Sequence, residues 1–167
     1  RKALKDGKQT YTTPENLEAE TAQHIANGKI VGWFQGRMEF GPRALGSRSI
    51  LADPTDPKMQ DHLNAVVKHR EEFRPFAPSV LQPKASEYFV GCHRSPFMLF
   101  VYEVVEDKKE LLPAVTHVDG TARVQTVDEE INPRYYKTIR EFEKIKGVPV
   151  LINTSFNVMG GPIVNTP

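Results

Sequence analysis

The chain has 167 residues, enough for one domain with a sizeable hydrophobic core. It carries 22 basic and 21 acidic residues, and the net charge of +1 excludes a global electrostatic field that would recruit nucleic acid. Any basic binding site must therefore be local. The single cysteine, Cys92, excludes an internal disulfide and a cysteine-built metal site, and we interpret it as a packing residue or an inert thiol.

The sequence contains neither a secretory signal nor an apolar run near the length of a membrane span, which favours a cytoplasmic protein. The chain begins with Arg1 rather than Met and stops at Pro167, directly after an apolar run. We therefore expect a piece of a longer protein. Residues 1–12 are predicted to be a polar linker or tail, and residues 13–167 a single domain.

The first predicted elements are a helix and two strands. A cap residue, a proline and an acid at 13–15 are typical of a helix start, and Gly28 is expected to end that helix. The apolar run at 29–35 predicts a buried strand, and residues 49–52 predict a short one. The expected apolar side of the helix consists of Leu17, Thr21, Ala22 and Ile25.

The same signals continue along the rest of the chain. They predict a helix opened by Asp56-Pro57 with Met59, Leu63, Val66 and Val67 on its apolar face, strands at 77–81, 97–104 (a central one) and 148–152, a solvated turn at 106–110, and a helix from Asn132 to Gly147 bearing Tyr136, Ile139, Phe142 and Ile145. Alternating strands and helices predict one α/β domain. Its sheet is expected to be mixed, because the connections 81–97 and 104–122 are too short or irregular for helical crossovers.

A glycine–arginine loop at 36–54 follows the first strand. Glycine permits close backbone approach, and arginine offers a planar fork of donors that matches phosphate or carboxylate. Loops at strand ends are where α/β proteins bind anions. The alternative is a surface loop whose arginines bridge local acids such as Glu39 and Asp53.

Three more polar segments lie next to apolar strands. Residues 68–81 carry bases together with two prolines, so a rigid site loop and a self-paired charge cluster with Glu71 and Glu72 are both open. The small polar residues and glycine pair at 153–162 predict a second phosphate or nucleotide loop, or else a polar turn. At 114–127, Asp119-Gly120 marks a tight turn before a strand.

That last segment also holds candidate binding side chains. Arg123 and Gln125 are expected on one face of a strand, opposite Val124. His117 and Asp119 are too few for a metal site, and we interpret them as a local turn or a substrate hydrogen bond.

The four loops together predict a cationic pocket if they converge. It would contain little that could act as a nucleophile or strong base, a composition that suits phosphoryl or nucleotidyl transfer. Neither a Walker-type motif nor a dinucleotide fingerprint is present. The side chains that the loops supply are Arg43, Lys68, Arg70, Arg74, Arg123, Ser155 and Asn157.

Five motifs carry a family resemblance: GRMEFGPRALGSRSILADP (36–54), KHREEFRPFAPSV (68–80), SPFMLF (95–100), THVDGTARVQTV (116–127) and GVPVLINTSFNV (147–158). With them the sequence resembles the C-terminal, YrdC-like domain of the O-carbamoyltransferase family, which includes NodU and the tobramycin and cephamycin carbamoyltransferases. A more distant likeness to threonylcarbamoyl-AMP synthases shows in the Lys68/Arg70 pair and at 155–157.

The resemblance implies a YrdC-like fold with a twisted, mixed parallel and antiparallel sheet and flanking helices. It implies that the domain binds carbamoyl phosphate and ATP, with Mg²⁺ expected, and makes carbamoyl adenylate while releasing pyrophosphate. An N-terminal domain of the actin-like ATPase superfold, absent from this sequence, would then pass the carbamoyl group to a small-molecule hydroxyl acceptor. A homodimer of the full-length enzyme is also compatible, whereas membrane and nucleic-acid partners are not expected.

The resemblance also implies residue roles, and no metal site in this domain. Arg43 and Arg123 are expected nearest the carbamoyl phosphate, Lys68 and Arg74 beside the ATP phosphates. The implied catalytic residues are Arg43, Lys68, Arg74, Arg123 and Ser155, and the implied substrate- or nucleotide-binding residues are Arg70, Ser79, His117, Asp119, Gln125, Asn153 and Asn157. Ser155 and Asn157 would hold phosphate or the adenylate.

Two positions depart from the family pattern. Met159-Gly160-Gly161 stands where Arg-Gly-Glu is expected, and Ser47 replaces a usual asparagine. Two other functions remain open: a nucleotide- or RNA-binding module without catalysis, and a degenerate scaffold that only docks a partner domain. The near-neutral charge counts against RNA, and the number of cations counts against a scaffold.

Overall fold

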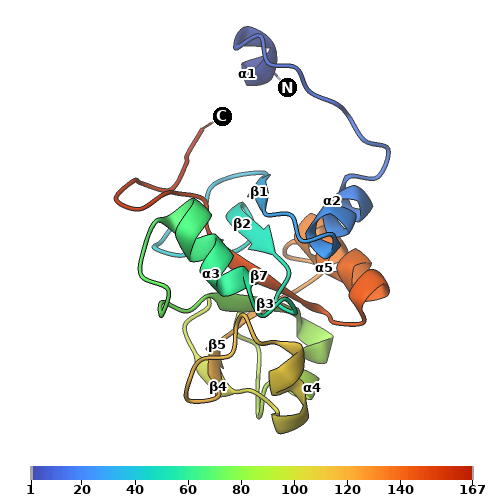
Figure 1. Ribbon diagram of the computed structural model, residues 1–167. Helices are drawn as coiled ribbons and strands as arrows, with labels where there is room; N and C mark the ends of the chain where they lie inside the picture. The colour runs from blue at the N-terminus through green and yellow to red at the C-terminus, as the bar shows by residue number, and fades with distance from the viewer. Residues whose placement is uncertain (1, 167) are drawn as a thin grey trace.

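The computed structural model of the protein describes residues 2–166. Its central feature is a five-stranded sheet, with a two-stranded sheet and short helices to one side of it (Figure 1). The elements in chain order are α1 (Lys2–Asp6), α2 (Leu17–Ala26), β1 (Val31–Phe34), β2 (Arg48–Ala52), α3 (Met59–Leu63), the π-helical turn η1 (Asn64–Lys68), β3 (Ala77–Leu81), the 3₁₀ turn η2 (Gln82–Lys84), α4 (Ala85–Tyr88), β4 (Val101–Glu103), the 3₁₀ helix η3 (Glu106–Leu111), β5 (Thr121–Arg123), β6 (Gln125–Val127), α5 (Pro133–Lys146) and β7 (Val150–Ser155).

The sheet is mixed, as the sequence predicted. Its strand order is β1-β2-β7-β3-β6, and β3 and β6 are parallel while the other neighbours are antiparallel. Strand β7 therefore lies in the middle, between β2 and β3. The residues that follow β7 emerge at one edge of the sheet, beside the ends of its neighbours.

Side-chain alternation along the strands divides the core into two layers. Ile50 of β2 and Ile152 of β7 belong to the cluster on the face covered by α3 and α4. Leu51 and Leu151, one residue away on the same strands, belong to the cluster formed with α2 and α5. Successive side chains of a strand point to opposite faces, so nearly continuous apolar strands are buried on both sides.

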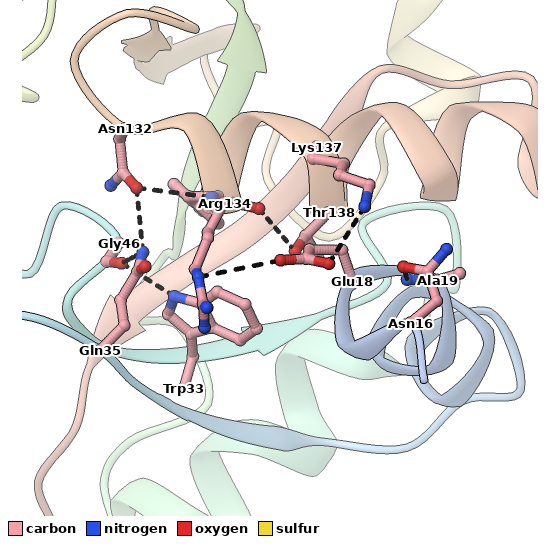
Figure 2. A network of polar contacts seen from close by, with 11 residues as sticks. Asn16, Glu18, Ala19, Trp33, Gln35, Gly46, Asn132, Arg134, Lys137 and Thr138 are labelled. Carbon is pink, nitrogen blue, oxygen red and sulfur yellow. Dashed lines mark hydrogen bonds and ion pairs between the residues drawn. The ribbon is translucent and has the colours of Figure 1, made fainter. Parts of the chain in front are cut away.

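Helices α2 and α5 lie side by side on one face of the sheet (Figure 1). Glu18 of α2 pairs with Lys137 of α5 at 3.3 Å and lies 4.0 Å from Arg134 (Figure 2). Helix α5 begins after Asn132, which accepts a hydrogen bond from the Tyr135 backbone N–H. The predicted ends of this helix, set by an N-cap side chain and a left-handed glycine, are therefore confirmed.

Some predicted core positions on the helices are wrong, because the buried face of the helix is rotated slightly about its axis from the predicted one. Tyr135, not Tyr136, is the fully buried tyrosine of α5, and Ile145 is exposed. Helix α2 begins after Asn16 rather than at 13–15, because the Asn16 side chain accepts from the Ala19 N–H. Its buried residues are Thr21, Ala22 and Ile25, while Leu17 is exposed.

The helix after Asp56-Pro57 departs from the predicted pattern in its second half. Met59 and Leu63 of α3 are buried as expected, but the chain then widens into the π-helical turn η1. The wider turn shifts each following side chain around the axis, which leaves Val66 exposed and buries Lys68. The predicted apolar face is thus wrong at Val66.

The predicted central strand at 97–104 is wrong. Only β4 is extended there, and it pairs with β5 in the small sheet rather than entering the five-stranded one. Phe97 and Val101 are largely exposed, and Met98 adopts a positive φ of 54° that turns the chain. The single strand expected around Val124 is likewise split, because β5 and β6 belong to different sheets.

The remaining expectations concern peripheral segments. Residues 106–110, predicted as a turn, form most of η3. Within the predicted linker, α1 is a short helix that stands away from the body of the molecule (Figure 1).

Cys92 is half-buried, and burial raises the pKa of its thiol to about 11, which agrees with an inert thiol. Among residues 2–166 no helix is long and apolar enough to span a membrane.

Candidate functional site

The three arginines of the glycine–arginine loop have different surroundings. Arg48 is buried, stacks on Phe34 with its guanidinium carbon 3.5 Å from the ring centroid, and donates to the Gln35 carbonyl at 2.8 Å. Arg37 is exposed to solvent. Arg43 is half-buried and lines a cavity at the edge of the sheet. Only Arg43 is therefore placed for ligand binding.

The local acids do not neutralise these arginines. One Glu39 oxygen accepts hydrogen bonds from the backbone N–H groups of Leu45 at 2.7 Å and Ser47 at 2.8 Å. Asp53 pairs with Lys146 at 3.1 Å. These acids therefore do not bridge the arginines of the loop. Glu39 instead holds the loop backbone in place through hydrogen bonds, a role that was not predicted from the sequence.

The far end of the loop is fixed at Gly46. Figure 2 shows the Trp33 indole and the Gln35 amide both directed at the Gly46 carbonyl, at 2.8 and 2.6 Å. The Gln35 amide also donates to the Asn132 side chain at the start of α5. Gly46 has a φ of +102°, and a Cβ there would lie 2.3 Å from the Tyr135 ring. Only glycine fits this position.

The π-helical turn η1 ends in Lys68, beside the segment that follows β7. The Lys68 ammonium donates to the Ser155 carbonyl at 2.6 Å and to the carbonyl and side-chain oxygens of Asn157, both at 3.0 Å. Burial, and secondarily Arg70, lowers the pKa of Lys68 from 10.5 to about 8. Lys68 thus joins two of the predicted loops.

The basic loop after η1 is organised by a buried amide. The Asn64 side-chain oxygen accepts from Arg70 Nε at 2.7 Å, and its NH₂ group donates to the carbonyls of Glu72 and Arg74 at 3.1 and 3.0 Å. Arg70 also lies over the Phe76 ring. Asn64 was not predicted as functional, because its hydrogen bonds depend on how the loop folds back.

The third loop contributes from β5. Burial, and next the neighbouring Arg43, lowers the pKa of Arg123. Burial also lowers the pKa of His117, although Asp119 partly opposes the shift. The Asp119 carboxylate accepts hydrogen bonds from the backbone N–H and the hydroxyl of Thr121. These two bonds are part of the predicted tight turn.

Side chains of the four predicted loops surround three adjoining cavities of about 220, 100 and 180 Å³. In the described part of the chain no Asp or Glu lines any of them. The predicted site residues that line them are Arg43, Lys68, Arg70, Arg74, Arg123, His117, Asn153, Ser155 and Asn157. We call these three cavities together the cationic cavity.

Three predicted site residues lie outside the lining of the cationic cavity. Asp119 sits in its turn, and the other two form a buried network behind the cavity wall. Ser79 donates to the Gln125 side-chain oxygen at 2.6 Å, and Gln125 donates to the Leu45 carbonyl at 2.9 Å. Ser79 and Gln125 therefore support the loop that carries Arg43.

Two of the arginines that line the cavity have buried donors without a partner among the described residues. The Nε atoms of Arg43 and Arg123 are buried and have no hydrogen-bond partner within residues 2–166. Neither guanidinium is in an ion pair in that part of the chain, although Arg74 pairs with Glu71 at 3.8 Å on the surface. Buried donors without partners are costly, so an anion is the natural partner for this pair.

A groove of about 420 Å³, larger than any one of the three cavities, lies beyond the loop segment 43–45. Its walls include the apolar side chains of Leu45, Phe97 and Ile131. The charged residues that line it are Arg94 and the two acids Glu39 and Asp128. The cationic cavity is the better candidate because it combines concentrated positive charge with unpartnered donors.

The described residues do not offer a metal site of their own. Within residues 2–166 there is no group of three His, Cys, Asp or Glu side chains that could hold a metal ion.

Fold and cavity together define a mixed α/β domain with a cationic cavity at a sheet edge. The family model described as "Carbamoyltransferase C-terminus" matches residues 22–167, and the chain belongs to this family. Nodulation protein NolO of Bradyrhizobium diazoefficiens is 52% identical over 155 residues, which cover 91% of this chain and 28% of NolO. Nodulation protein U of Sinorhizobium fredii is 44% identical over 142 residues, covering 85% of this chain and 25% of that protein.

An uncharacterized protein of Synechocystis, sll1178, is 49% identical and covers 94% of this chain. The chain thus spans about a quarter of the length of the curated relatives it matches. Among solved structures, HypF of T. kodakarensis superposes with a TM-score of 0.58 at 16% identity, over 93% of this chain and 19% of that one. This likeness concerns the fold, and the predicted α/β domain with a mixed sheet and flanking helices is confirmed.

Proposed function

We propose that this domain binds carbamoyl phosphate and ATP in the cationic cavity and forms carbamoyl adenylate with release of pyrophosphate. Membership of the carbamoyltransferase family supports the carbamoyl chemistry. The observation that carries the proposal is the cavity itself, in which Arg43, Arg70 and Arg123 converge without any lining carboxylate in the described residues. Such a cavity favours ligands with several negative charges.

The reaction balances in two steps. Water first cleaves carbamoyl phosphate into carbamate and inorganic phosphate. A carbamate oxygen then attacks the α-phosphorus of ATP, the bond from that phosphorus to the bridging oxygen breaks, and pyrophosphate leaves. Each turnover therefore yields one phosphate, one pyrophosphate and one carbamoyl adenylate.

The side chains contribute charge and position rather than covalent chemistry. Negative charge builds on the phosphoryl oxygens and the leaving group, and guanidinium groups fixed around them lower the barrier. The buried Nε atoms of Arg43 and Arg123 are available to donate to these oxygens because they have no protein partner in residues 2–166. Mg²⁺ would arrive bound to the ATP phosphates and add further positive charge.

The carbamoyl group would leave this domain for its acceptor. Relatives about four times as long have room for a further domain, and we propose that an N-terminal domain of the actin-like ATPase superfold passes the group to a substrate hydroxyl. Direct transfer would protect the adenylate from water.

Pyrophosphate release from ATP, measured with and without carbamoyl phosphate, tests the proposal. We expect release that requires carbamoyl phosphate in the wild-type protein. Arg43→Ala and Arg123→Ala should each reduce it by about 100-fold or more, because each removes a charge from the transition state.

Arg37→Ala is the matched control, since Arg37 belongs to the same loop but is exposed and does not line the cationic cavity. It should keep nearly full activity. Pyrophosphate release that does not depend on carbamoyl phosphate, or that persists in both Arg43→Ala and Arg123→Ala, would contradict the proposal.

A further inference from the structure

The floor of the cationic cavity contains an acceptor without a partner. Asn153 of β7 lines this cavity and is only 1% exposed. Its side-chain oxygen is buried and has no hydrogen-bond donor within residues 2–166. An unsatisfied buried acceptor is costly, and in a cavity it indicates a donor that arrives with a ligand.

The orientation of the Asn153 amide is fixed by its neighbours. Its NH₂ group donates to the Gln125 side-chain oxygen at 2.8 Å and to the Ala44 carbonyl at 3.1 Å. The Gln125 amide is fixed in turn, because its own NH₂ group donates to the Leu45 carbonyl. Turning Asn153 over would place its oxygen against two acceptors. The side-chain oxygen of Asn153, not its nitrogen, is therefore the atom without a hydrogen-bond partner within the described chain.

The surroundings narrow the chemistry of the ligand. Arg43 and Arg123 line the same cavity as Asn153, and each has an unpartnered Nε–H. A ligand that satisfies all three groups needs acceptor oxygens for the arginines and an N–H or O–H for Asn153. An acyl phosphate with a methyl group supplies only the acceptors, whereas one with a terminal amide supplies both.

We propose that Asn153 determines specificity by accepting a hydrogen bond from the NH₂ group of the carbamoyl moiety, an assignment that rests on the proposed function. The phosphate and carbonyl oxygens face Arg43 and Arg123. Asn153 then rejects acyl phosphates that lack the amide hydrogen, because they leave its oxygen buried and unpaired. Discrimination against a missing hydrogen-bonding group is stronger than discrimination by size alone.

Two stable ligands of equal charge test this assignment on the wild-type chain. Phosphonoacetamide carries the amide, and acetonylphosphonate replaces its NH₂ by a methyl group. Calorimetry should show that phosphonoacetamide binds about ten-fold or more tightly than acetonylphosphonate, the size expected for an unsatisfied buried acceptor. This comparison needs no substitution, so it is decisive even if a variant does not fold.

Asn153→Leu removes the acceptor and should bring the two affinities within about two-fold of each other. The control is Thr126→Val, which also deletes a buried hydrogen bond, the one from the Ser95 N–H at 2.8 Å. Thr126 lies next to Gln125 but does not line the cationic cavity. Its variant should keep the wild-type preference for the amide.

The outcomes separate this assignment from the proposed function. Equal binding of both ligands by the wild-type chain, in competition with carbamoyl phosphate, would overturn the role of Asn153 and leave adenylate formation standing. A preference that persists in Asn153→Leu would also overturn it. Failure of folded wild-type protein to bind carbamoyl phosphate would overturn both.

Discussion

Lys68 combines a positive charge, deep burial and a lowered pKa. Its ammonium is surrounded by oxygens of Ser155 and Asn157, so it holds together the loop after η1 and the loop after β7. A π-helical turn delivers it there, and such turns often occur at functional sites. Lys68 therefore contributes both to the shape of the cationic cavity and to its charge.

The lowered pKa of Lys68 has a defined consequence for stability. The lysine of the unfolded chain titrates near 10.5, whereas Lys68 in the folded protein titrates near 8. Between these values the unfolded chain binds more protons, so the contribution of Lys68 to stability rises with pH from about 8 to 10.5. Chemical denaturation of wild type and Lys68→Met over this range should show that increase only in the wild type.

The same titration should affect ligand binding in the opposite direction. Above about pH 8 Lys68 loses its charge, and the affinity for inorganic phosphate should fall. Lys68→Arg should move the fall to higher pH. An identical pH profile in both proteins would show that another group controls anion binding.

Glu39 is the second single residue with a predictable effect. Its carboxylate accepts from the N–H groups of Leu45 and Ser47 and thereby fixes the loop that carries Arg43. Glu39→Ala should cost about 1.5–3 kcal/mol of unfolding free energy, the usual range for hydrogen bonds to a charged group, and should lower pyrophosphate release. Glu39→Gln, which keeps an acceptor oxygen, should lose less of both. Equal losses in the two variants would show that the acceptor oxygen of Glu39 does not hold the loop in place.

Among the elements, the glycine–arginine loop depends most on a single backbone position. Gly46 has a positive φ and lies against the Tyr135 ring, whereas Gly36 has a positive φ but open space around it. Gly46→Ala should destabilise by about 2–4 kcal/mol, from backbone strain and overpacking together. Gly36→Ala should cost only about 1 kcal/mol, from strain alone. Urea denaturation measures both, and equal costs would mean that the contact with Tyr135 relaxes.

Elements with strong local signals were predictable from the sequence. Helix α5 carries its own caps, and β2 and β3 are short apolar segments bounded by polar residues. The strand at 97–104 was misplaced because an apolar run does not show which sheet a segment joins. The motifs identified the arginines of the cavity. The structural roles of Glu39 and Asn64 were not predicted, because each binds groups that only the folded loops bring near.

For the whole molecule, the peripheral N-terminal segment offers a test of the domain limits. Helix α1 stands apart from the sheet (Figure 1), and Leu4 and Tyr11 are exposed. Deleting residues 1–12 should change the free energy of unfolding by less than about 0.5 kcal/mol, because little surface becomes newly exposed. A larger loss in a denaturation experiment would mean that this segment belongs to the domain.

In the proposed reaction the α-phosphorus of ATP is attacked, and analysis of the products distinguishes this from attack at the β- or γ-phosphorus. The protein should be incubated with ATP and carbamoyl phosphate labelled with ¹³C, and the products followed by mass spectrometry. We expect a ¹³C-labelled carbamoyl adenylate together with equal amounts of pyrophosphate and phosphate. Formation of ADP, or of AMP and pyrophosphate without carbamoyl phosphate in the reaction, would contradict it.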